Sequence, residues 1–424
     1  MELSLDNGES FISNDSPFLV SFRDIVSEIT DTTYSTHSVY YYPAKFIPHV
    51  VRFCINTYTR ENDWMLDPFA GSGTVGLESY LCKRNSVLMD LNPLLKEIIE
   101  VKIYRGKEEP CYHRLYDILS SFNLSSAPKF YPQYSNIRYW YLDEIFEVLA
   151  SYWGWLKTLE SSIYSKIIQA SLIKASRYFS LAEHKIPKLF RSKSKTRFIY
   201  ELIKQDWQKK LKSMIHDISF KNFNNILDFF QRTKGFNVNV FCFSGVDSST
   251  FLPALEQGID CVITSPPYLQ AQEYIRTFKL DLYWLGYTEA DIKAISSLEI
   301  PYRKATRIIE TETINKVKSQ ISRKNLLQYF DSYFCHIINA LENVSKLLKT
   351  GGYLCIFTGN PKADNIEIPI WKILKEYFSE KKFETVNIFE DRIKTRQLFR
   401  SRKNKNPEGI KSEFLIVLKK IQEI

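Results

Sequence analysis

The stretch of sequence that decides the fold is Trp64-Met65-Leu66-Asp67-Pro68-Phe69-Ala70-Gly71-Ser72-Gly73-Thr74-Val75-Gly76-Leu77. It contains an apolar run that ends at Asp67, a glycine-rich turn, and a helical pattern that begins near Thr74. A second short apolar run follows and also ends in an acid, Ser86-Val87-Leu88-Met89-Asp90. The order strand, glycine turn, helix, strand and acid predicts the first half of a nucleotide-binding α/β fold.

Three of the 14 glycines of the chain fall in that turn, at Gly71, Gly73 and Gly76. Such a concentration in a glycine-poor chain indicates a backbone that has to be bare. The spacing G-x-G-x-x-G, with Asp90 about 20 residues further on, matches a dinucleotide site. A phosphate loop is excluded, because Leu77-Glu78 stands where such a loop needs Lys followed by Ser or Thr.

Asp67 argues for a different ligand in this turn. A carboxylate at the end of the strand lies near the centre of the bound ligand, where it would repel a pyrophosphate. The same charge would attract the ammonium and sulfonium groups of S-adenosylmethionine. We therefore expect S-adenosylmethionine at this site, with a nicotinamide-dependent oxidoreductase as a rival interpretation.

The composition is that of a globular protein with a basic surplus. The 424 residues are 44% hydrophobic and 25% charged, and the net charge of +9 indicates a polyanionic partner. No apolar run is long enough for a membrane span, and the first residues lack the basic region of a secretory signal. The seven cysteines are scattered and the six histidines have no ligand spacing, so we expect a reducing cytosol and no catalytic metal.

A second motif is Asp260-Cys261-Val262-Ile263-Thr264-Ser265-Pro266-Pro267-Tyr268. A short strand runs into two prolines, which cannot donate to a sheet ladder, so the strand has to stop there. In an open α/β sheet the carboxyl end of a strand is where ligands bind. We therefore expect both motifs at one edge of the sheet.

Together these motifs resemble those of the S-adenosylmethionine-dependent DNA amino-methyltransferases of restriction–modification systems. The segment Asp67-Pro68-Phe69-Ala70-Gly71-Ser72-Gly73-Thr74 is similar to the donor-binding motif of that family, and Thr264-Ser265-Pro266-Pro267-Tyr268 is similar to its catalytic motif. The resemblance covers roughly residues 35–104 and 236–421.

Three weaker matches extend the resemblance. Tyr42-Pro43-Ala44-Lys45-Phe46-Ile47-Pro48 resembles the element that helps to hold the methionine portion of the donor. Asp90-Leu91-Asn92-Pro93 resembles the ribose-binding acid and its neighbours. Gly245-Val246-Asp247 follows a predicted third strand and stands where the family places a group near the adenine. The cofactor-binding residues that the resemblance implies are Tyr42, Pro43, Lys45, Asp67, Phe69, Gly71, Gly73, Thr74, Asp90, Asn92 and Asp247.

The chemistry of an exocyclic base amine accounts for the residue types of the catalytic motif. This amine is a poor nucleophile, and two acceptors aimed at its hydrogens favour the tetrahedral nitrogen of the transition state. Our candidates are the Ser265 hydroxyl and the Pro266 carbonyl, whose direction Pro266 and Pro267 fix. Tyr268 offers a face on which a base flipped out of the duplex can stack. Ser at the first motif position favours N4 of cytosine over N6 of adenine in the resembling family.

The remaining patterns complete the predicted fold. Gly351–Phe357, Phe383–Ile388 and Phe414–Leu418 predict the last strands, and Tyr274–Trp284 predicts a helix packed on the sheet. We expect an α/β fold, a doubly wound seven-stranded Rossmann-like methyltransferase sheet with a large helical insertion. The predicted domains are 1–104 and 236–424, the two parts of the core, and 105–235, a helical target-recognition insertion.

Two acid-free basic segments are candidates for phosphate contacts, one inside the insertion and one between the last two strands. A solvated basic loop is the alternative for the first of them. A third candidate is the polar stretch 287–325, which includes Arg303, Lys304 and Arg307. The predicted DNA-binding residues are Lys185, Lys188, Arg191, Lys193, Lys195, Arg197, Arg396, Arg400 and Arg402.

The function that we expect from the resemblance is site-specific methylation of N4 of cytosine in double-stranded DNA, with S-adenosylmethionine as donor. By the same resemblance, the modification protects DNA from a partner restriction endonuclease. N6-adenine methylation is the nearest alternative. Guanine-N2 methylation of RNA, the oxidoreductase and a catalytically silent DNA-binding module are further rivals.

Overall fold

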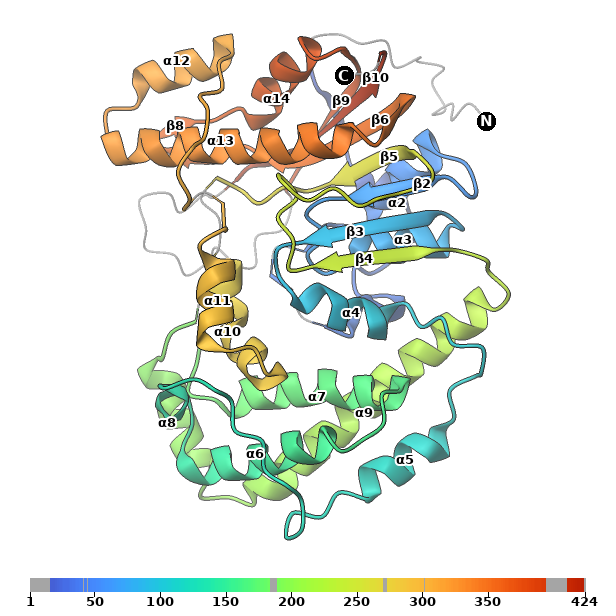
Figure 1. Cartoon of the computed structure of the whole chain (residues 1–424), viewed down its shortest axis with the longest axis vertical. Coiled ribbons are helices and arrows are strands. Elements are labelled where there is room, and N and C mark those ends of the chain that lie inside the picture. The colour runs from blue at the N-terminus through green and yellow to red at the C-terminus, as the bar shows by residue number, and fades with distance from the viewer. Residues whose placement is uncertain are drawn as a thin grey trace.

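The computed structural model describes residues 16–40, 42–43, 45–183, 189–269, 273–300, 302–393 and 410–422. Its centre is a twisted eight-stranded sheet with the order β1-β9-β10-β6-β5-β2-β3-β4 (Figure 1). The strands of this sheet are β1 (Phe18–Val20), β2 (Trp64–Asp67), β3 (Asn85–Asp90), β4 (Val240–Ser244), β5 (Ile259–Thr264), β6 (Leu348–Gly359), β9 (Phe383–Arg392) and β10 (Ser412–Lys420). A separate two-stranded sheet is formed by β7 (Lys362–Ala363) and β8 (Ile366–Glu367).

The chain reverses its direction of winding between β2 and β5. From β2 it moves outward through β3 and β4, and it then returns to β5 on the other side of β2. Leu66 of β2 pairs in parallel with Val87 of β3 and with Val262 of β5. The strands of the large sheet are parallel except β10, which runs antiparallel to β6 and β9. The ends of β2 and β5 therefore form the switch point at which open α/β sheets bind ligands.

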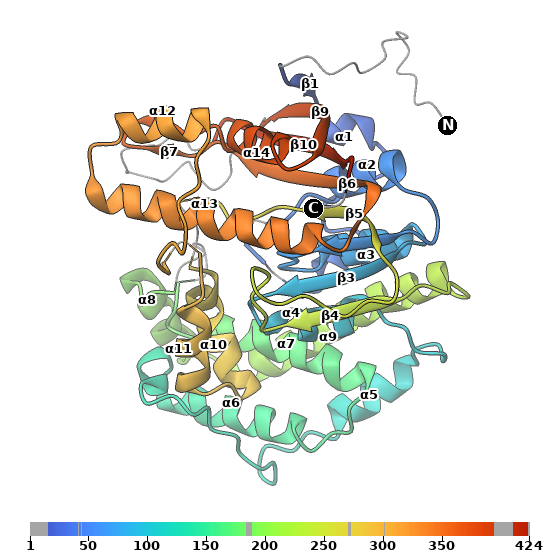
Figure 2. The same ribbon diagram turned by 45° about the horizontal axis from the view of Figure 1, so that its top comes forward.

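Helices cover both faces of the sheet, as the period-two alternation of strand side chains requires. Met65 packs with the helices on one face, whereas its neighbour Leu66 packs with those on the other. The first face carries α1 (Phe22–Ile25), α2 (Pro48–Tyr58), α3 (Thr74–Leu81) and part of α4 (Leu94–Lys102). The second carries α12 (Glu312–Gln320), α13 (Lys324–Ser345) and α14 (Ile370–Ser379) (Figure 2).

The predicted doubly wound sheet is confirmed, with all seven expected strands. The eighth, β1, lies parallel to β9 at the edge of the sheet and was not predicted. A strand of three residues is too short to give a readable alternation of apolar and polar side chains.

The described residues between 105 and 235 form helices and no β-strand, and these helices gather beyond the β4 edge of the sheet (Figure 1). They are α5 (Tyr112–Ser120), α6 (Asp143–Leu156), α7 (Ile163–Phe179), α8 (Lys193–Leu202) and α9 (Trp207–Thr233), with the short 3-10 helix η2 (Ile137–Trp140). No helix in the described parts of the chain is both long and apolar enough to cross a membrane.

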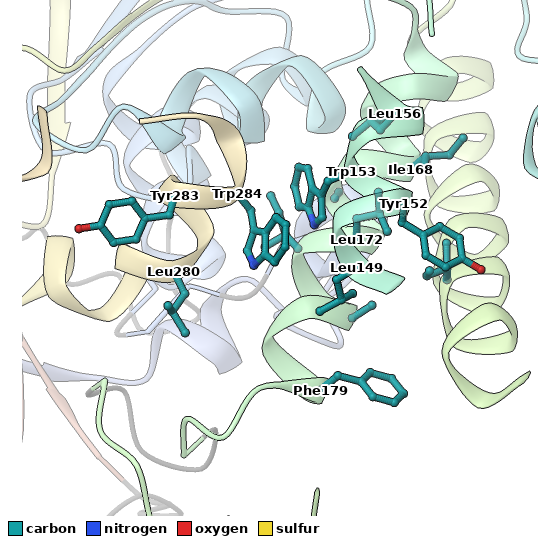
Figure 3. Packing of buried hydrophobic residues seen from close by; sticks show 14 of the residues in the cluster. Leu149, Tyr152, Trp153, Leu156, Ile168, Leu172, Phe179, Leu280, Tyr283 and Trp284 are labelled. Atoms are coloured by element: carbon teal, nitrogen blue, oxygen red, sulfur yellow. The ribbon is translucent and has the colours of Figure 1, made fainter. Parts of the chain in front are cut away.

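The helix after the catalytic motif, α10 (Tyr274–Leu285), packs on these helices, and α11 (Glu289–Ser296) follows it. Trp284 of α10 stacks on Trp153 of α6 with 5.6 Å between ring centroids (Figure 3). The indole N–H of Trp284 donates to the Tyr141 hydroxyl at 2.9 Å, and that of Trp153 donates to Ser176 at 2.9 Å. The prediction that this helix packs on the sheet is therefore wrong, because its buried aromatic face meets the insertion.

Candidate functional site

The glycine turn after β2 depends on the absence of side chains at two positions. Gly71 and Gly73 have φ of +52° and +70°, in the left-handed region that favours glycine. A Cβ at Gly73 would lie 2.1 Å from Cδ1 of Ile99, and one at Gly71 would lie 3.2 Å from Cε1 of Tyr42. Gly73 is the N-cap of α3, so the turn brings the start of this helix close to the end of β2.

Asp67 ties β2 to β5 at the switch point. Its Oδ1 accepts hydrogen bonds from the Thr264 hydroxyl at 2.7 Å and from the Phe69 amide at 3.0 Å. Burial raises the pKa of Asp67 to about 7, although both bonds oppose this rise. The carboxylate therefore joins the donor-motif turn to the strand that precedes the catalytic motif.

Asp90, at the end of β3, holds the same turn from the other side. Its Oδ2 accepts from the Gly71 amide at 2.7 Å, and its Oδ1 accepts from the Asn92 amide at 2.7 Å. Burial raises the pKa of this carboxyl to about 6. The acid predicted to bind ribose thus also fixes the backbone of the glycine turn.

A pocket of about 880 Å³, including the part open to solvent, is lined by Asp90 and by the glycine turn. Predicted site residues that line it are Tyr42, Lys45, Phe69, Gly71, Asp90, Asn92, Asp247, Ser265 and Pro267. Pro43, Asp67, Gly73, Thr74, Pro266 and Tyr268 are not among its lining residues.

The segment before the donor motif, which contains Tyr42 and Lys45, is held by a network of buried hydrogen bonds. Lys45 donates to the His37 carbonyl at 2.7 Å, and burial lowers the pKa of its ammonium to about 8. The buried carboxylate of Glu78 in α3 bonds to the His37 ring at 2.7 Å and accepts from Nε of Arg52 at 2.9 Å. This network holds the segment against the helix that begins at the glycine turn, and leaves Tyr42 to line the pocket.

The predicted catalytic motif reaches the pocket through Ser265 and Pro267. Among the described residues, the Ser265 side chain has no hydrogen-bond partner, so its oxygen is available to accept. The hydroxyl of Tyr268 donates to Oε1 of Glu413 in β10 at 2.6 Å, and a Cβ at Gly359 would lie 3.6 Å from the tyrosine ring. The ring of Tyr268 is therefore held at its hydroxyl by β10, which lies one strand beyond β6 from β5.

Asp247 has its acceptor sites occupied by other side chains. It forms an ion pair with the guanidinium of Arg303 and accepts from the amide and hydroxyl of Ser249 at 2.9 and 2.8 Å. These bonds keep the pKa of Asp247 below its usual value although burial opposes them. The residue predicted to lie near the adenine does line the pocket, but it is held by Arg303.

Sequence reasoning did not assign several pocket residues to the donor site. Tyr274 and Ile275 start α10, and the segment after α11 contributes Leu298, Glu299, Ile300 and Arg303. Tyr274 stacks on Tyr42 with 5.9 Å between ring centroids. No regular motif marks these positions, because they reach the pocket only through the packing of α10 and α11.

The predicted DNA-binding residues fall into three groups. Lys193 and Arg197 are exposed on α8, and the guanidinium of Arg191 lies 5.2 Å from the centroid of the Tyr139 ring. Lys195 is only 3% exposed and donates to the Tyr178 carbonyl at 2.6 Å, so its ammonium is not available on the surface. Lys185, Lys188, Arg396, Arg400 and Arg402 lie outside the described residues.

The other polar segment, 287–325, is also partly used within the protein. Arg303 pairs with Asp247, as described above, and Arg307 pairs with Glu342. We therefore leave both arginines out of the surface considered for DNA.

The chemical character of the pocket suits a ligand with hydroxyl, amine and positively charged groups. The carboxylates of Asp90 and Glu299 accept hydrogen bonds from backbone amides. Among the described residues, neither carboxylate forms an ion pair with a cation. Tyr42, Phe69 and Tyr274 give the same pocket an aromatic wall. No group of three or more His, Cys, Asp and Glu side chains in the described ranges is arranged to hold a metal ion.

Comparisons with known proteins agree with this site. The family model described as DNA methylase matches residues 13–101. The type II methyltransferase M.AvaI of Nostoc sp. is 27% identical over 203 residues, which cover 42% of this chain and 41% of that protein. The type II methyltransferase M.BsoBI of Geobacillus stearothermophilus is 21% identical over 422 residues, covering 87% and 82% of the two chains.

Among solved structures, the rRNA methyltransferase aviRa from Streptomyces viridochromogenes aligns over 96% of this chain and 97% of its own, at 9% identity and a TM-score of 0.33. The chain spans about two fifths of the length of the first curated relatives that it matches. The chain is thus similar to DNA methylases over residues 13–101 and to type II DNA methyltransferases over longer stretches.

Proposed function

We propose that the chain transfers a methyl group from S-adenosylmethionine to the exocyclic N4 of cytosine, within a specific sequence of double-stranded DNA. One observation carries this proposal. Ser265 and Pro267 of the catalytic motif line the same pocket as Gly71 and Asp90 of the donor site. A methyl donor in this pocket therefore has an open path to an amine bound at the catalytic motif.

S-adenosylmethionine supplies the reactive methyl group on a positively charged sulfur. We assign to the protein the task of holding the base amine in line with that group. The Ser265 hydroxyl and the Pro266 carbonyl accept hydrogen bonds from the two N–H groups of the amine, which favours the tetrahedral nitrogen of the transition state. As the new N–C bond forms and the C–S bond breaks, the amine loses one proton to solvent. Tyr268, held by Glu413, gives the flipped base a face for stacking.

The preference for cytosine rests on Ser265. A neutral hydroxyl stands where the N6-adenine enzymes of the family usually have a carboxylate, and the described surroundings of Ser265 leave its oxygen free. N6-adenine methylation is the alternative, since both reactions need the same pair of acceptors.

We further propose that the helices α5–α9 serve in target recognition, with Lys193 and Arg197 of α8 contacting phosphates. The packing of α10 on α6 supports this proposal, because it links the insertion to the helix that directly follows the catalytic motif. The biological role proposed by analogy with the type II relatives is protection of DNA from a cognate restriction endonuclease.

The test is mass analysis of nucleosides from DNA that was incubated with the protein and isotope-labelled S-adenosylmethionine. The proposal predicts labelled N4-methylcytosine from a mixed-sequence plasmid and no label with Ser265→Ala. Labelled N6-methyladenine would shift the assignment to the alternative base. Label in RNA but not in DNA, or reduction of a nicotinamide cofactor without methyl transfer, would overturn the proposal.

A further inference from the structure

The donor pocket has a wall that lies outside the two family motifs. Leu298, Glu299, Ile300 and Arg303 follow α11 and line the same pocket as Asp90 and Gly71. Two side chains of this wall, Leu298 and Ile300, are apolar, and the aromatic residue Phe69 and the glycine turn line the same pocket. The wall is therefore placed to contact the adenosine part of a bound donor.

Glu299 is the chemically unusual member of this wall. Its side chain is buried, with the residue 9% exposed, and its Oε1 accepts from the Ile275 amide at 2.9 Å. This amide belongs to the first turn of α10, which favours a negative charge there. No described cation lies within ion-pair distance of the carboxylate. Burial raises its pKa to about 7, and the charges of Glu273 and Asp90 add to this rise. A buried carboxylate in this setting needs further hydrogen-bond donors.

The bound ligand is the natural source of those donors, since Asp247 is already committed. Arg303 and Ser249 occupy the Asp247 carboxylate, so this acid is not free to bind the ligand. The carboxylates left in the pocket are Asp90 and Glu299. A ribose diol offers two hydroxyl donors at a fixed spacing and carries no charge that would need neutralising.

We infer that Glu299 binds a ribose hydroxyl of the methyl donor, as a second acid beside Asp90. This inference rests on the proposed function, because it takes the ligand of the pocket to be S-adenosylmethionine. Glu299 is then a residue that binds the methyl donor, and the packing of α10 and α11 places it in the pocket. Its hydrogen bond to Ile275 holds the carboxylate in position before the ligand arrives.

The experiment is calorimetric binding of S-adenosylhomocysteine and of its 2′-deoxyribose and 3′-deoxyribose forms. Glu299→Gln keeps the size of the side chain and an oxygen for the Ile275 amide, but it loses the charge-assisted bond. We expect about fivefold weaker binding of S-adenosylhomocysteine, and about tenfold or more for Glu299→Ala. For one of the deoxy forms, both variants should bind within about twofold of the wild-type protein. Glu256→Gln, at an exposed acid outside the pocket, is the matched control and should bind all three compounds like the wild type.

Equal losses for all three compounds would overturn the inference, since they would indicate a structural effect or a contact elsewhere on the ligand. Unchanged affinity of both Glu299 variants would overturn it as well. The wild-type protein with the deoxy forms gives a readout that does not depend on folding of any variant, and undiminished binding of both forms would contradict a ribose contact at Glu299. Binding with the expected pattern but no methylation of DNA would leave the inference intact and refute the proposed function. Failure of the wild type to bind S-adenosylhomocysteine would refute both.

Discussion

The hydrogen bond between Thr264 and Asp67 offers a direct test of how the two motifs are joined. Thr264 is fully buried, and its hydroxyl donates to a carboxylate that is itself buried. Thr264→Val removes the donor while keeping a β-branched side chain that suits a strand. A hydrogen bond to a charged group contributes about 1.5–3 kcal/mol, so the free energy of unfolding should fall by about 2 kcal/mol when Asp67 is ionised.

The loss should depend on pH in a defined direction. The pKa of Asp67 is raised from 3.8 in the unfolded chain to about 7 in the fold. The stability that comes from its protonated form is present below pH 4 and is lost as the pH rises toward 7. The Thr264 hydroxyl favours the ionised form, so its removal raises the folded-state pKa further, and the variant continues to lose stability above pH 7. The two proteins should therefore differ most near pH 9 and by less than about 1 kcal/mol near pH 6.

Urea unfolding followed by tryptophan fluorescence between pH 6 and 9 measures this difference. Thr264→Ser is the control, because it keeps the hydroxyl and should show a loss that does not change with pH. A Thr264→Val effect that is equal at pH 6 and pH 9, or larger at pH 6, would refute the reasoning about Asp67.

Three further predictions address the glycine turn, Tyr268 of the second motif and the proposed DNA surface. Gly73→Ala should lower the free energy of unfolding by more than the roughly 1–2 kcal/mol of left-handed backbone strain, because the new Cβ meets Ile99. Gly351→Ala is the control, since Gly351 also has a positive φ but its Cβ would have no atom within 4 Å. Equal losses in the two variants would contradict the close contact at Gly73. Tyr268→Phe leaves the partly buried Glu413 without its hydroxyl partner and should cost about 1–3 kcal/mol in urea unfolding. This loss should shrink when Glu413→Gln is already present, and strict additivity of the two losses would argue against the bond. Replacing both Lys193 and Arg197 with Ala should lower the slope of log affinity for DNA against log salt concentration by about 2. The control replaces Arg60 and Lys83, which precede the amino ends of β2 and β3, and should leave this slope unchanged. Identical slopes for the two double variants would remove α8 from the DNA surface.

Local sequence signals predicted the parts of the site that depend on backbone geometry. The crowding of glycine at 71 and 73 reflects positive φ and close packing, and the two prolines after Thr264 mark the end of β5. Both features follow from steric rules that act within a few residues. Short apolar runs located the seven main strands.

Features set by tertiary packing could not be predicted in this way. Lys195 lies in an acid-free run, yet the packing of α8 turns it inward to the Tyr178 carbonyl. Glu299 and Arg303 have no motif, because their position depends on how α10 and α11 pack on the insertion. Asp247 was predicted from its place after a strand, but its pairing with Arg303 joins residues 56 positions apart.

The most direct test of the central claim is a crystal structure of the protein with S-adenosylhomocysteine and a short DNA duplex that it methylates. The account predicts the adenosine between the glycine turn and the Glu299 wall, and the sulfur facing a flipped base whose amine meets Ser265 and the Pro266 carbonyl. A thioether bound away from this pocket, or a base held at another surface, would contradict it.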